Sequence, residues 1–204
     1  MMITIIDYGM GNTGSIVNML KKIGIKSRIT SDPDEIAKAQ KIILPGVGHF
    51  DRAMERIDQY GIREILDQKA LKERVPVLGI CLGMQLLTKS SEEGQCAGLG
   101  WIPAKTVRFR FPKETPLKIP HMGWNLVQQA TPSPLTENFE PEHRFYFVHS
   151  YHAQVEDEKY SILKTVHGYS FDAAIQNDNV FGVQFHPEKS HRFGMRLLEN
   201  FSKL

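Results

Sequence analysis

The stretch Val75-Pro76-Val77-Leu78-Gly79-Ile80-Cys81-Leu82-Gly83-Met84-Gln85 decides the fold that this sequence predicts. An apolar run ends in a glycine-flanked cysteine, and a segment compatible with a helix follows. This is the pattern of a nucleophile elbow, in which a strand turns sharply into a helix and holds the middle side chain above the edge of a sheet. Here Cys81 stands in place of the more usual serine. Gly79 and Gly83 suit such a turn because it leaves little room for Cβ atoms.

Cys81 is therefore a candidate nucleophile. The N–H groups at the start of the helix would point at its sulfur and stabilise a thiolate. The backbone N–H of Leu82 would point to where an oxyanion forms. A free cysteine is more often a small apolar core residue, and that alternative stays open until a base is found elsewhere in the chain.

Length and composition limit the class of protein. The chain has 204 residues, of which 41% are hydrophobic and 24% charged, which predicts one globular domain over residues 1–204. The net charge of +2 gives no electrostatic reason to expect nucleic acid or an anionic membrane as partner. Two cysteines, Cys81 and Cys96, cannot build a disulfide framework. Neither a secretory leader nor an apolar run of membrane length is visible, so a cytoplasmic location is expected.

Apolar runs and helical patterns alternate in the first 90 residues, which indicates βαβ units and a parallel sheet. Strands are predicted at residues 2–6, 26–30 and 42–44 and before Cys81, with helices at 15–23, from Asp32 to Ile36, at 53–57 and at 62–71. The second half predicts strands at 104–111, 123–127, 144–148, 162–166, 173–176 and 180–185 and a helix at 196–201. The predicted fold class is α/β, with a central, mostly parallel mixed sheet flanked by helices and antiparallel additions in the second half.

Gln184-Phe185-His186-Pro187-Glu188-Lys189 supplies the candidate base. A predicted strand ends at Phe185, and Pro187 disfavours helical geometry at His186. The Glu188 side chain, two residues further on, can reach back to the imidazole and orient it. Taken alone, this stretch is better explained as an exposed histidine beside a solvated glutamate. Together with an elbow cysteine, the order cysteine, histidine, glutamate forms a coherent catalytic triad.

A rival signal lies near the start of the chain. Gly9, Gly11 and Gly14 follow a predicted strand with the spacing of the dinucleotide-binding fingerprint, and Asp32 stands at a suitable distance for the ribose ligand. However, Asp32-Pro33 looks more like a helix cap than a ribose ligand, and a lone fingerprint is a weak signal. A tight surface loop at an interface is the preferred interpretation.

The remaining histidines do not show metal-ligand spacing. His49 follows a glycine loop as a helix cap would, and His149-Ser150-Tyr151 follows a predicted strand and is expected to line the same pocket as the triad. The others are His121, His143, His152, His167 and His191. Trp124 fits a core position or an interface equally well, and Cys96 lies in a loop without a nearby base motif.

At this point the motifs support a resemblance that covers nearly the whole chain. Gly79-Ile80-Cys81-Leu82-Gly83-Met84-Gln85 with His186-Pro187-Glu188 resembles the class I, or triad, glutamine amidotransferases. Further stretches are similar to the glutaminase subunits of imidazole glycerol phosphate synthases. They are Asp7-Tyr8-Gly9-Met10-Gly11-Asn12, Pro45-Gly46-Val47-Gly48-His49-Phe50, Met122-Gly123-Trp124-Asn125, Tyr146-Phe147-Val148-His149-Ser150-Tyr151 and His186-Pro187-Glu188-Lys189-Ser190.

The resemblance implies hydrolysis of glutamine to glutamate and ammonia. Cys81 would attack the side-chain amide carbon and form a thioester, His186 would move protons, and Glu188 would hold the histidine tautomer. It also implies the groups around the reacting atoms. The oxyanion would meet N–H groups of Leu82 and of the Val47-Gly48 segment, which reorients in this family so that the lone subunit is nearly inactive. The positions that hold glutamine are matched by Gln85, Gly48, Ser150 and Tyr151. No metal or other cofactor is implied.

The resemblance further implies a partner, a (β/α)8-barrel cyclase subunit that forms a heterodimer with this chain. Free ammonia would be protonated in water, so a closed tunnel across the interface favours its delivery. The product would be imidazole glycerol phosphate with AICAR, in histidine biosynthesis. The positions near the interface are matched by Asn12, Met122, Trp124, Tyr146 and Lys189.

Two stretches depart from the pattern of the histidine-pathway members. Thr13-Gly14 replaces a larger residue followed by arginine, and His191-Arg192-Phe193-Gly194 is less typical. Both resemble a paralogous branch that supplies ammonia to a sugar-modifying amidotransferase in surface-polysaccharide synthesis. Alternatives of other classes are a catalytically silent scaffold or binding module on the same fold, and a cysteine hydrolase or redox enzyme acting on another small substrate.

Overall fold

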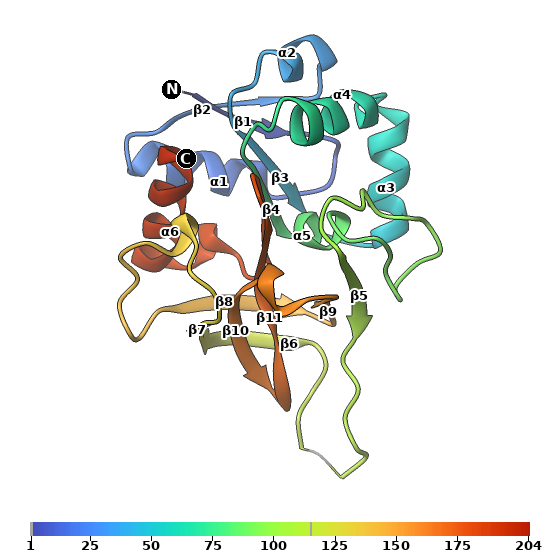
Figure 1. Ribbon diagram of the computed structural model, residues 1–204, viewed down its shortest axis with the longest axis vertical. Coiled ribbons are helices and arrows are strands. Elements are labelled where there is room, and N and C mark those ends of the chain that lie inside the picture. Colours follow the sequence, from blue (N-terminus) through green and yellow to red (C-terminus); the bar gives the residue numbers. More distant parts are fainter. Residues whose placement is uncertain (1, 115) are drawn as a thin grey trace.

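The first half of the chain builds the parallel part of a mixed sheet (Figure 1). The computed structural model describes residues 2–114 and 116–204. Five parallel strands lie side by side in the order β2-β1-β3-β4-β12, with bounds β1 (Met2–Ile6), β2 (Lys26–Thr30), β3 (Ile42–Gly46), β4 (Val77–Cys81) and β12 (Val180–Val183). The apolar runs of β1, β3, β4 and β12 suit this position, because strands inside parallel sheets are covered on both faces, whereas β2 at the edge is polar and partly exposed.

The second half extends the sheet with antiparallel strands. Beyond β12 follow β11 (Tyr169–Asn177), β10 (Ser161–His167) and β7 (Gln128–Gln129), while β9 (Tyr151–Val155) pairs with both β11 and β5 (Ala104–Arg108). Strands β6 (His121–Leu126) and β8 (Arg144–His149) form a separate two-stranded sheet, whose strands run across β10 and β11 in the view of Figure 1. The predicted fold class, an α/β mixed sheet flanked by helices, is confirmed.

Helices cover both faces of the parallel strands (Figure 1). The cluster on one face includes residues of α1 (Thr13–Lys22) and α6 (His191–Lys203). The cluster on the other face includes residues of α2 (Pro33–Ala37), α3 (Phe50–Gln59), α4 (Arg63–Asp67) and α5 (Leu82–Leu86), with a π-helical turn at Gln68–Lys72 after α4. Short 3-10 turns lie at Pro134–Thr136, Glu158–Tyr160 and Pro187–Lys189. No helix among residues 2–114 and 116–204 combines the length and the apolar character needed to cross a membrane.

The glycine-rich turn after β1 serves helix capping and packing. Asn12 caps α1 by accepting a hydrogen bond from the N–H of Ser15 (3.3 Å). Asp32, the residue that the dinucleotide fingerprint would use for ribose, caps α2 by accepting from the N–H of Asp34 (2.9 Å). Gly11 has φ +150°, and a Cβ there would lie 3.1 Å from the Pro45 ring. The interpretation of Asp32 as a helix cap is confirmed.

Several predicted boundaries were wrong. Strand β9 was missed because Ser150 alone separates it from β8 in a single polar and aromatic stretch without glycine or proline. Helix α6 begins at His191 rather than Arg196; its apolar spacing already starts at Phe193, four residues before Leu197, but Gly194 in the first turn weakens the helical pattern there. The predicted strand 104–111 ends at Arg108, and 180–185 ends at Val183. The tight connection Asn177-Asp178-Asn179 between β11 and β12 is confirmed.

Substitution of Gly83 tests whether the close approach of α5 to β3 is needed for stability. A Cβ at Gly83 would collide with the carbonyl oxygen of Leu44. We expect Gly83→Ala to lower the free energy of unfolding by about 2–4 kcal/mol in urea denaturation. Gly14→Ala is the control, since nothing lies within 4 Å of its added Cβ, and it should change the free energy by about 0.5 kcal/mol or less. Equal effects of the two substitutions would contradict this account of the contact.

Candidate active site

Cys81 lies in a strained turn between β4 and α5. Its backbone has φ 55° and ψ −111°, a conformation that non-glycine residues rarely adopt. The flanking glycines allow the turn, since a Cβ at Gly79 would lie 2.6 Å from the carbonyl oxygen of Gly83. Leu82 is the first residue of α5, so its N–H has no acceptor within the helix. The turn therefore places a thiol beside an available N–H donor, as the elbow pattern predicted.

His186 and Glu188 form a buried pair next to this turn. The imidazole Nδ1 lies 2.7 Å from Glu188 Oε1, and the side chains are 3% and 2% exposed. Burial acts to lower the pKa of His186, but the Cys81 sulfur and the Glu188 carboxylate together raise it to about 9. The imidazole therefore holds its proton at neutral pH. Since Nδ1 faces the carboxylate, the proton available for transfer is the one on Nε2.

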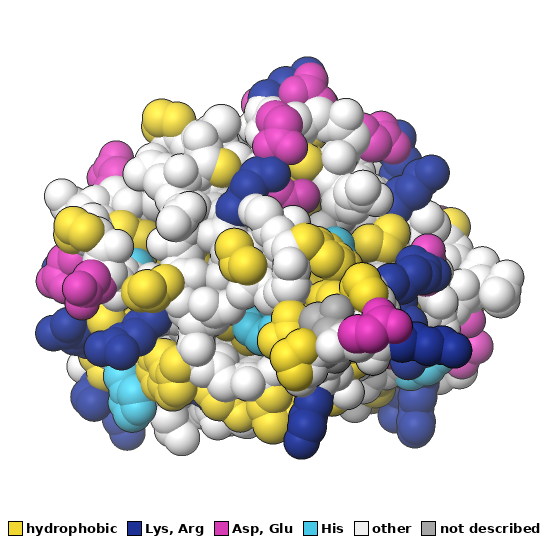
Figure 2. All heavy atoms as spheres, turned by 90° about the horizontal axis from the view of Figure 1, so that it is seen from below, with side chains coloured by type: hydrophobic (Ala, Val, Ile, Leu, Met, Phe, Trp, Pro, Cys, Tyr) yellow, Lys and Arg dark blue, Asp and Glu magenta, His cyan; other side chains and the backbone are white. Residues whose placement is uncertain are grey.

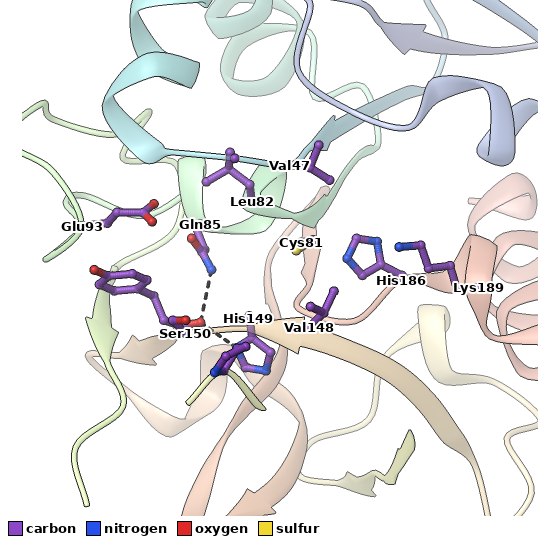
Figure 3. A pocket seen from close by; sticks show the side chains of 13 residues that line it. Val47, Cys81, Leu82, Gln85, Glu93, Val148, His149, Ser150, His186 and Lys189 are labelled. Carbon is purple, nitrogen blue, oxygen red and sulfur yellow. Dashed lines mark hydrogen bonds between the residues drawn. The ribbon is translucent and has the colours of Figure 1, made fainter. Parts of the chain in front are cut away.

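The other nitrogen of His186 is left without a partner. Nε2 is buried and forms no hydrogen bond, and the same holds for Glu188 Oε2. The Cys81 sulfur lies close enough to raise the pKa of His186, although no formed hydrogen bond joins it to Nε2. Figure 3 shows the sulfur of Cys81 and the ring of His186 side by side at one end of the pocket. A buried unpaired nitrogen beside a thiol is available for proton transfer to a bound substrate.

The backbone around His186 is fixed by Ser190. Its hydroxyl donates to the carbonyl oxygen of His186 (2.6 Å) and accepts from the N–H of Tyr146 on β8 (3.0 Å). The N–H of His186 in turn donates to the Tyr146 carbonyl (2.9 Å). These bonds tie the turn that carries the histidine to the small β6–β8 sheet, so the position of the base depends on the second half of the chain.

A cavity of about 370 Å³ opens above the cysteine. Nine of the residues predicted for the site line it: Val47, Gly48, Cys81, Leu82, Gln85, Ser150, Tyr151, His186 and Lys189. Gln85 crosses the cavity floor, where its Nε2 donates to the Tyr151 carbonyl (3.2 Å) and to Gln184 Oε1 (3.1 Å). Glu188 stands behind His186, so the structure brings all three predicted triad residues together.

The Val47-Gly48 segment forms one rim of the cavity. Val47 is 43% exposed, and Gly48 has φ +111°, which favours glycine. The strand before them is fixed, because the buried Tyr8 hydroxyl donates to the Pro45 carbonyl (2.6 Å). The segment thus follows a fixed strand end and lies at the rim next to Leu82 at the start of α5 (Figure 3).

Sequence reasoning missed Glu93. This side chain lines the cavity, and its Oε2 accepts a hydrogen bond from the N–H of Phe50 at the start of α3 (2.9 Å). In Figure 3 it lies on the far side of Gln85 from Cys81. The local sequence Ser91-Glu92-Glu93 reads as an ordinary polar loop, so no sequence signal could have separated Glu93 from a solvated glutamate.

Four of the five residues predicted for the partner interface meet on one surface. Trp124 and Tyr146 are register partners in the β6–β8 sheet, with ring centroids 6.3 Å apart, and the Lys189 ammonium lies 5.8 Å from the Tyr146 ring. Met122 and Trp124 are 63% and 45% exposed. Asn12 is exposed at the start of α1. The view from below in Figure 2 shows several groups of hydrophobic side chains across that side of the molecule, with most lysine and arginine toward its edges.

Two other residues considered in the sequence analysis, His49 and Cys96, have structural surroundings that explain them without a catalytic role. His49 stands at the N-cap of α3 but forms no side-chain cap. Cys96 is free and half-buried, and its N–H donates to Asp51 Oδ1 (3.0 Å); burial raises the pKa of its thiol, and the Asp51 charge adds to this. Within residues 2–114 and 116–204, no cluster of three or more histidine, cysteine or acidic side chains has the arrangement of a metal site.

These parts are the ones that acyl transfer requires. A sulfur nucleophile stands beside an imidazole that a carboxylate holds, with an N–H donor at the start of a helix. The carboxylate of Glu93 and the amide of Gln85 add polar groups at the other end of the cavity. The site can therefore bind a small polar molecule and attack a carbonyl carbon at its Cys81 end.

Comparison with known proteins points in the same direction. Residues 4–204 match the model of the family "Glutamine amidotransferase class-I". The chain is 54% identical over 202 residues to "Imidazole glycerol phosphate synthase subunit HisH 2" of Methanococcus maripaludis, with 99% of each chain covered. It is 48% identical to the subunit HisH of Bdellovibrio bacteriovorus and 46% identical to the subunit HisH 2 of Pseudomonas aeruginosa, with 100% of each chain covered.

Solved structures share the fold. A crystal structure of a glutamine amidotransferase superposes with a TM-score of 0.74 at 18% identity and covers 98% of this chain and 97% of its own. The structure of PurLQS from Thermotoga maritima gives the same TM-score and identity, with coverage of 99% and 97%. At this identity the likeness concerns the fold alone.

The charge of Glu188 can be tested through the pKa of His186. Glu188→Gln removes the carboxylate, so the imidazole should lose its proton at a pH below the value of about 9 in the wild type. NMR titration of the ring signals of His186 measures this directly. Glu199→Gln on exposed α6 is the control and should leave the pKa of His186 unchanged. An unchanged pKa in the Glu188 variant would exclude the carboxylate as a cause.

The same shift has a consequence for stability. A raised pKa means that the folded state favours the protonated imidazole. The stabilisation that His186 contributes to folding is therefore complete below about pH 6.5 and is lost as the pH rises through about 9. The difference in unfolding free energy between wild type and Glu188→Gln should therefore shrink over this range. A difference that grows toward high pH would contradict the assignment.

Proposed function

Because this chain belongs to the class I glutamine amidotransferase family, we propose that it hydrolyses glutamine as the glutaminase subunit of an imidazole glycerol phosphate synthase. The observation that carries the proposal is the strained Cys81 turn beside the buried His186–Glu188 pair in one cavity. A silent scaffold would not need a nucleophile held in a costly backbone conformation next to a buried charged pair. The relatives at 42–54% identity carry the name of that subunit.

Glutamine fits the cavity in one direction. Its ammonium group would meet the carboxylate of Glu93, which already faces the cavity while its Oε2 accepts from Phe50. Its carboxylate would lie near Ser150 and Tyr151, and its side-chain amide would then reach Cys81. Gln85 holds the middle of this path through its bonds to Tyr151 and Gln184. Recognition of both backbone charges would explain selection of a free amino acid rather than a peptide.

The triad performs hydrolysis in two steps. The Cys81 thiolate attacks the amide carbon, and the oxyanion is met by the N–H of Leu82 and one from the Val47-Gly48 segment. His186, protonated at neutral pH, gives its Nε2 proton to the departing ammonia and leaves a thioester. The neutral imidazole then takes a proton from water, whose hydroxyl replaces the sulfur, and glutamate leaves as the thiolate and imidazolium form again.

A partner would cover the β6–β8 surface. Val148 and Lys189 line the cavity, while their neighbours Met122 and Tyr146 belong to the surface of the β6–β8 sheet. Ammonia formed at Cys81 therefore lies close to this face, and in open water it would be protonated and lose its nucleophilicity. A (β/α)8-barrel cyclase seated here would receive it through a closed passage and give imidazole glycerol phosphate and AICAR.

A specific observation also favours a second acceptor pathway. Two of the relatives named above carry the number 2, as HisH 2, and Thr13-Gly14 departs from the histidine-pathway pattern at the start of α1. A paralogous subunit would perform the same chemistry at Cys81 and supply a sugar-modifying amidotransferase instead. The two pathways differ only in the partner, which the following measurement separates.

Glutamate release from glutamine should rise strongly when the barrel cyclase of histidine synthesis from the same organism and its nucleotide ligand are added. That result would establish the glutaminase, the partner and the pathway together. If no rise occurs while Cys81 still reacts with a glutamine-analogue alkylator, the paralogous pathway replaces the histidine pathway. If Cys81 fails to react even with the partner present, the silent scaffold replaces the enzyme, and preferred turnover of esters, thiols or peptides would indicate another hydrolase.

Substitution of the nucleophile tests the triad. Cys81→Ala should lower glutamate release by about a thousandfold or more, because no other nucleophile lies at the turn. Binding of the variant to the cyclase should remain, measured by calorimetry. Cys96→Ala is the matched control and should keep full activity, since Cys96 lies in a loop against Asp51. Activity retained by the Cys81 variant would end the proposal.

Substitution on the exposed sheet tests the partner surface. Trp124→Ala should raise the Kd for the cyclase by about tenfold or more, as is usual for a large aromatic side chain at the centre of an interface. Leu71→Ala is the control, because Leu71 is at least as exposed (54% against 45% for Trp124) but lies in the π-helical turn after α4. Equal Kd values for the two variants would place the interface elsewhere.

A further inference from the structure

Four histidines that the proposed reaction does not use surround one buried ring. The centroid of Phe109 lies 6.3, 5.3, 4.6 and 5.2 Å from those of His121, His149, His152 and His167. Each of the four has at least one ring nitrogen in a hydrogen bond with a protein group. Three of them are buried, and two, His121 and His149, are register partners in the β6–β8 sheet. Two of these histidines form a continuous path.

The direction of the hydrogen bonds along this path is fixed. His149 Nδ1 lies 2.7 Å from the carbonyl oxygen of Tyr151, which can only accept, so Nδ1 carries the proton. Burial holds the pKa of His149 well below its ordinary range, so the ring is neutral and Nε2 accepts. His121 Nδ1, 2.9 Å away, must then donate to it. Burial also lowers the pKa of His121 to about 4, and its Nε2 accepts from the Asn125 amide (3.3 Å).

One end of the path lies in the cavity. The Tyr151 carbonyl that accepts from His149 also accepts from Gln85 Nε2 (3.2 Å). Gln85 and Tyr151 both line the cavity, and His149 lines it beside them (Figure 3). The histidine therefore fixes the carbonyl that orients the Gln85 amide, and through it the group on which the substrate would rest.

The other end lies in the exposed sheet. Asn125 and His121 both belong to β6, and the neighbours Trp124 and Leu126 are 45% and 53% exposed. The Asn125 amide also donates to the Val166 carbonyl on β10 (2.8 Å), which holds the strand end in place. The path thus joins a surface strand to the cavity through two neutral rings, each of which accepts one hydrogen bond and donates one.

We propose that His121 and His149 are positioning residues that couple the placement of β6 to the affinity of the cavity for glutamine. The inference rests on the proposed function, since it concerns the same cavity and its substrate. Neither ring touches the triad, so the coupling acts on binding through Tyr151 and Gln85 rather than on the chemical step at Cys81. A partner that seats on Trp124 would fix β6 and thereby order the cavity.

Two substitutions at His121 separate positioning from packing. In His121→Asn the side-chain amide can occupy the place of Nδ1 and still donate to His149. In His121→Gln the amide reaches the place of Nε2 instead and leaves His149 without its donor. Both variants bury one amide in place of a ring, so a purely structural role predicts similar effects on the free energy of unfolding and on function.

The measurement is inactivation of the full chain by the chloroketone analogue of glutamine, which alkylates Cys81. We expect His121→Gln to raise the concentration for half-maximal inactivation about three- to tenfold, the range for one lost buried hydrogen bond. Its limiting rate should stay within twofold of the wild type, and His121→Asn should match the wild type in both parameters. Equal half-saturation in all three proteins, or a change in limiting rate alone, would overturn the coupling.

The outcome also distinguishes this inference from the proposed function. A wild-type chain that neither reacts with the analogue nor releases glutamate, even with the cyclase, would overturn both. If inactivation of the wild type by the analogue saturates but the two His121 variants have equal half-saturation concentrations, only the coupling is overturned. NMR of ¹⁵N-labelled histidine gives a further check that needs no activity: His121 and His149 should both be Nδ1-H tautomers, and a proton on Nε2 of His149 would contradict the path.

Discussion

The close contact between α5 and β3 is the constraint on which the rest of the structure depends. Gly83 lies against the carbonyl of Leu44 with no space for a side chain, and all five residues of α5 are buried. Because of this contact, the chain passes from β4 into α5 through a strained backbone conformation at Cys81, which costs about 1–3 kcal/mol. Burial of α5 between the sheet and α3 offsets that cost, so the thiol stays above the sheet edge.

The base is held by a different kind of interaction. His186 and Glu188 are almost fully buried, and neither charge would be stable there alone. Each compensates the other over 2.7 Å, and the Cys81 sulfur together with this carboxylate lets the imidazole keep its proton to a higher pH than usual. The unpaired Nε2 is left over from this arrangement. The ion pair thus occupies Nδ1 of the imidazole and leaves Nε2 available to a substrate.

Local patterns in the sequence predicted the elements that form from neighbours. The glycine-flanked Cys81, the cap at Asp32 and the two-residue step from His186 to Glu188 are all short-range features, and the structure has each of them. The features that were missed depend on partners far along the chain. Glu93 meets Phe50 over 43 residues, and His121 meets His149 over 28. Strand β9 is defined by pairing with β5 and β11 rather than by its own composition.

The position of β8 gives a structural reason for the coupling proposed between surface and cavity. Along this strand Phe145, Phe147 and His149 are buried, while the alternate residues Tyr146 and Val148 are partly exposed. The exposed set faces the proposed partner and the cavity rim, and the buried set packs against the core. Because the period of a strand is two residues, a shift of β8 moves both sets together. The proposed coupling between interface and site would therefore act through one strand shared by both, reinforced by the histidine path, and needs no long chain of residues.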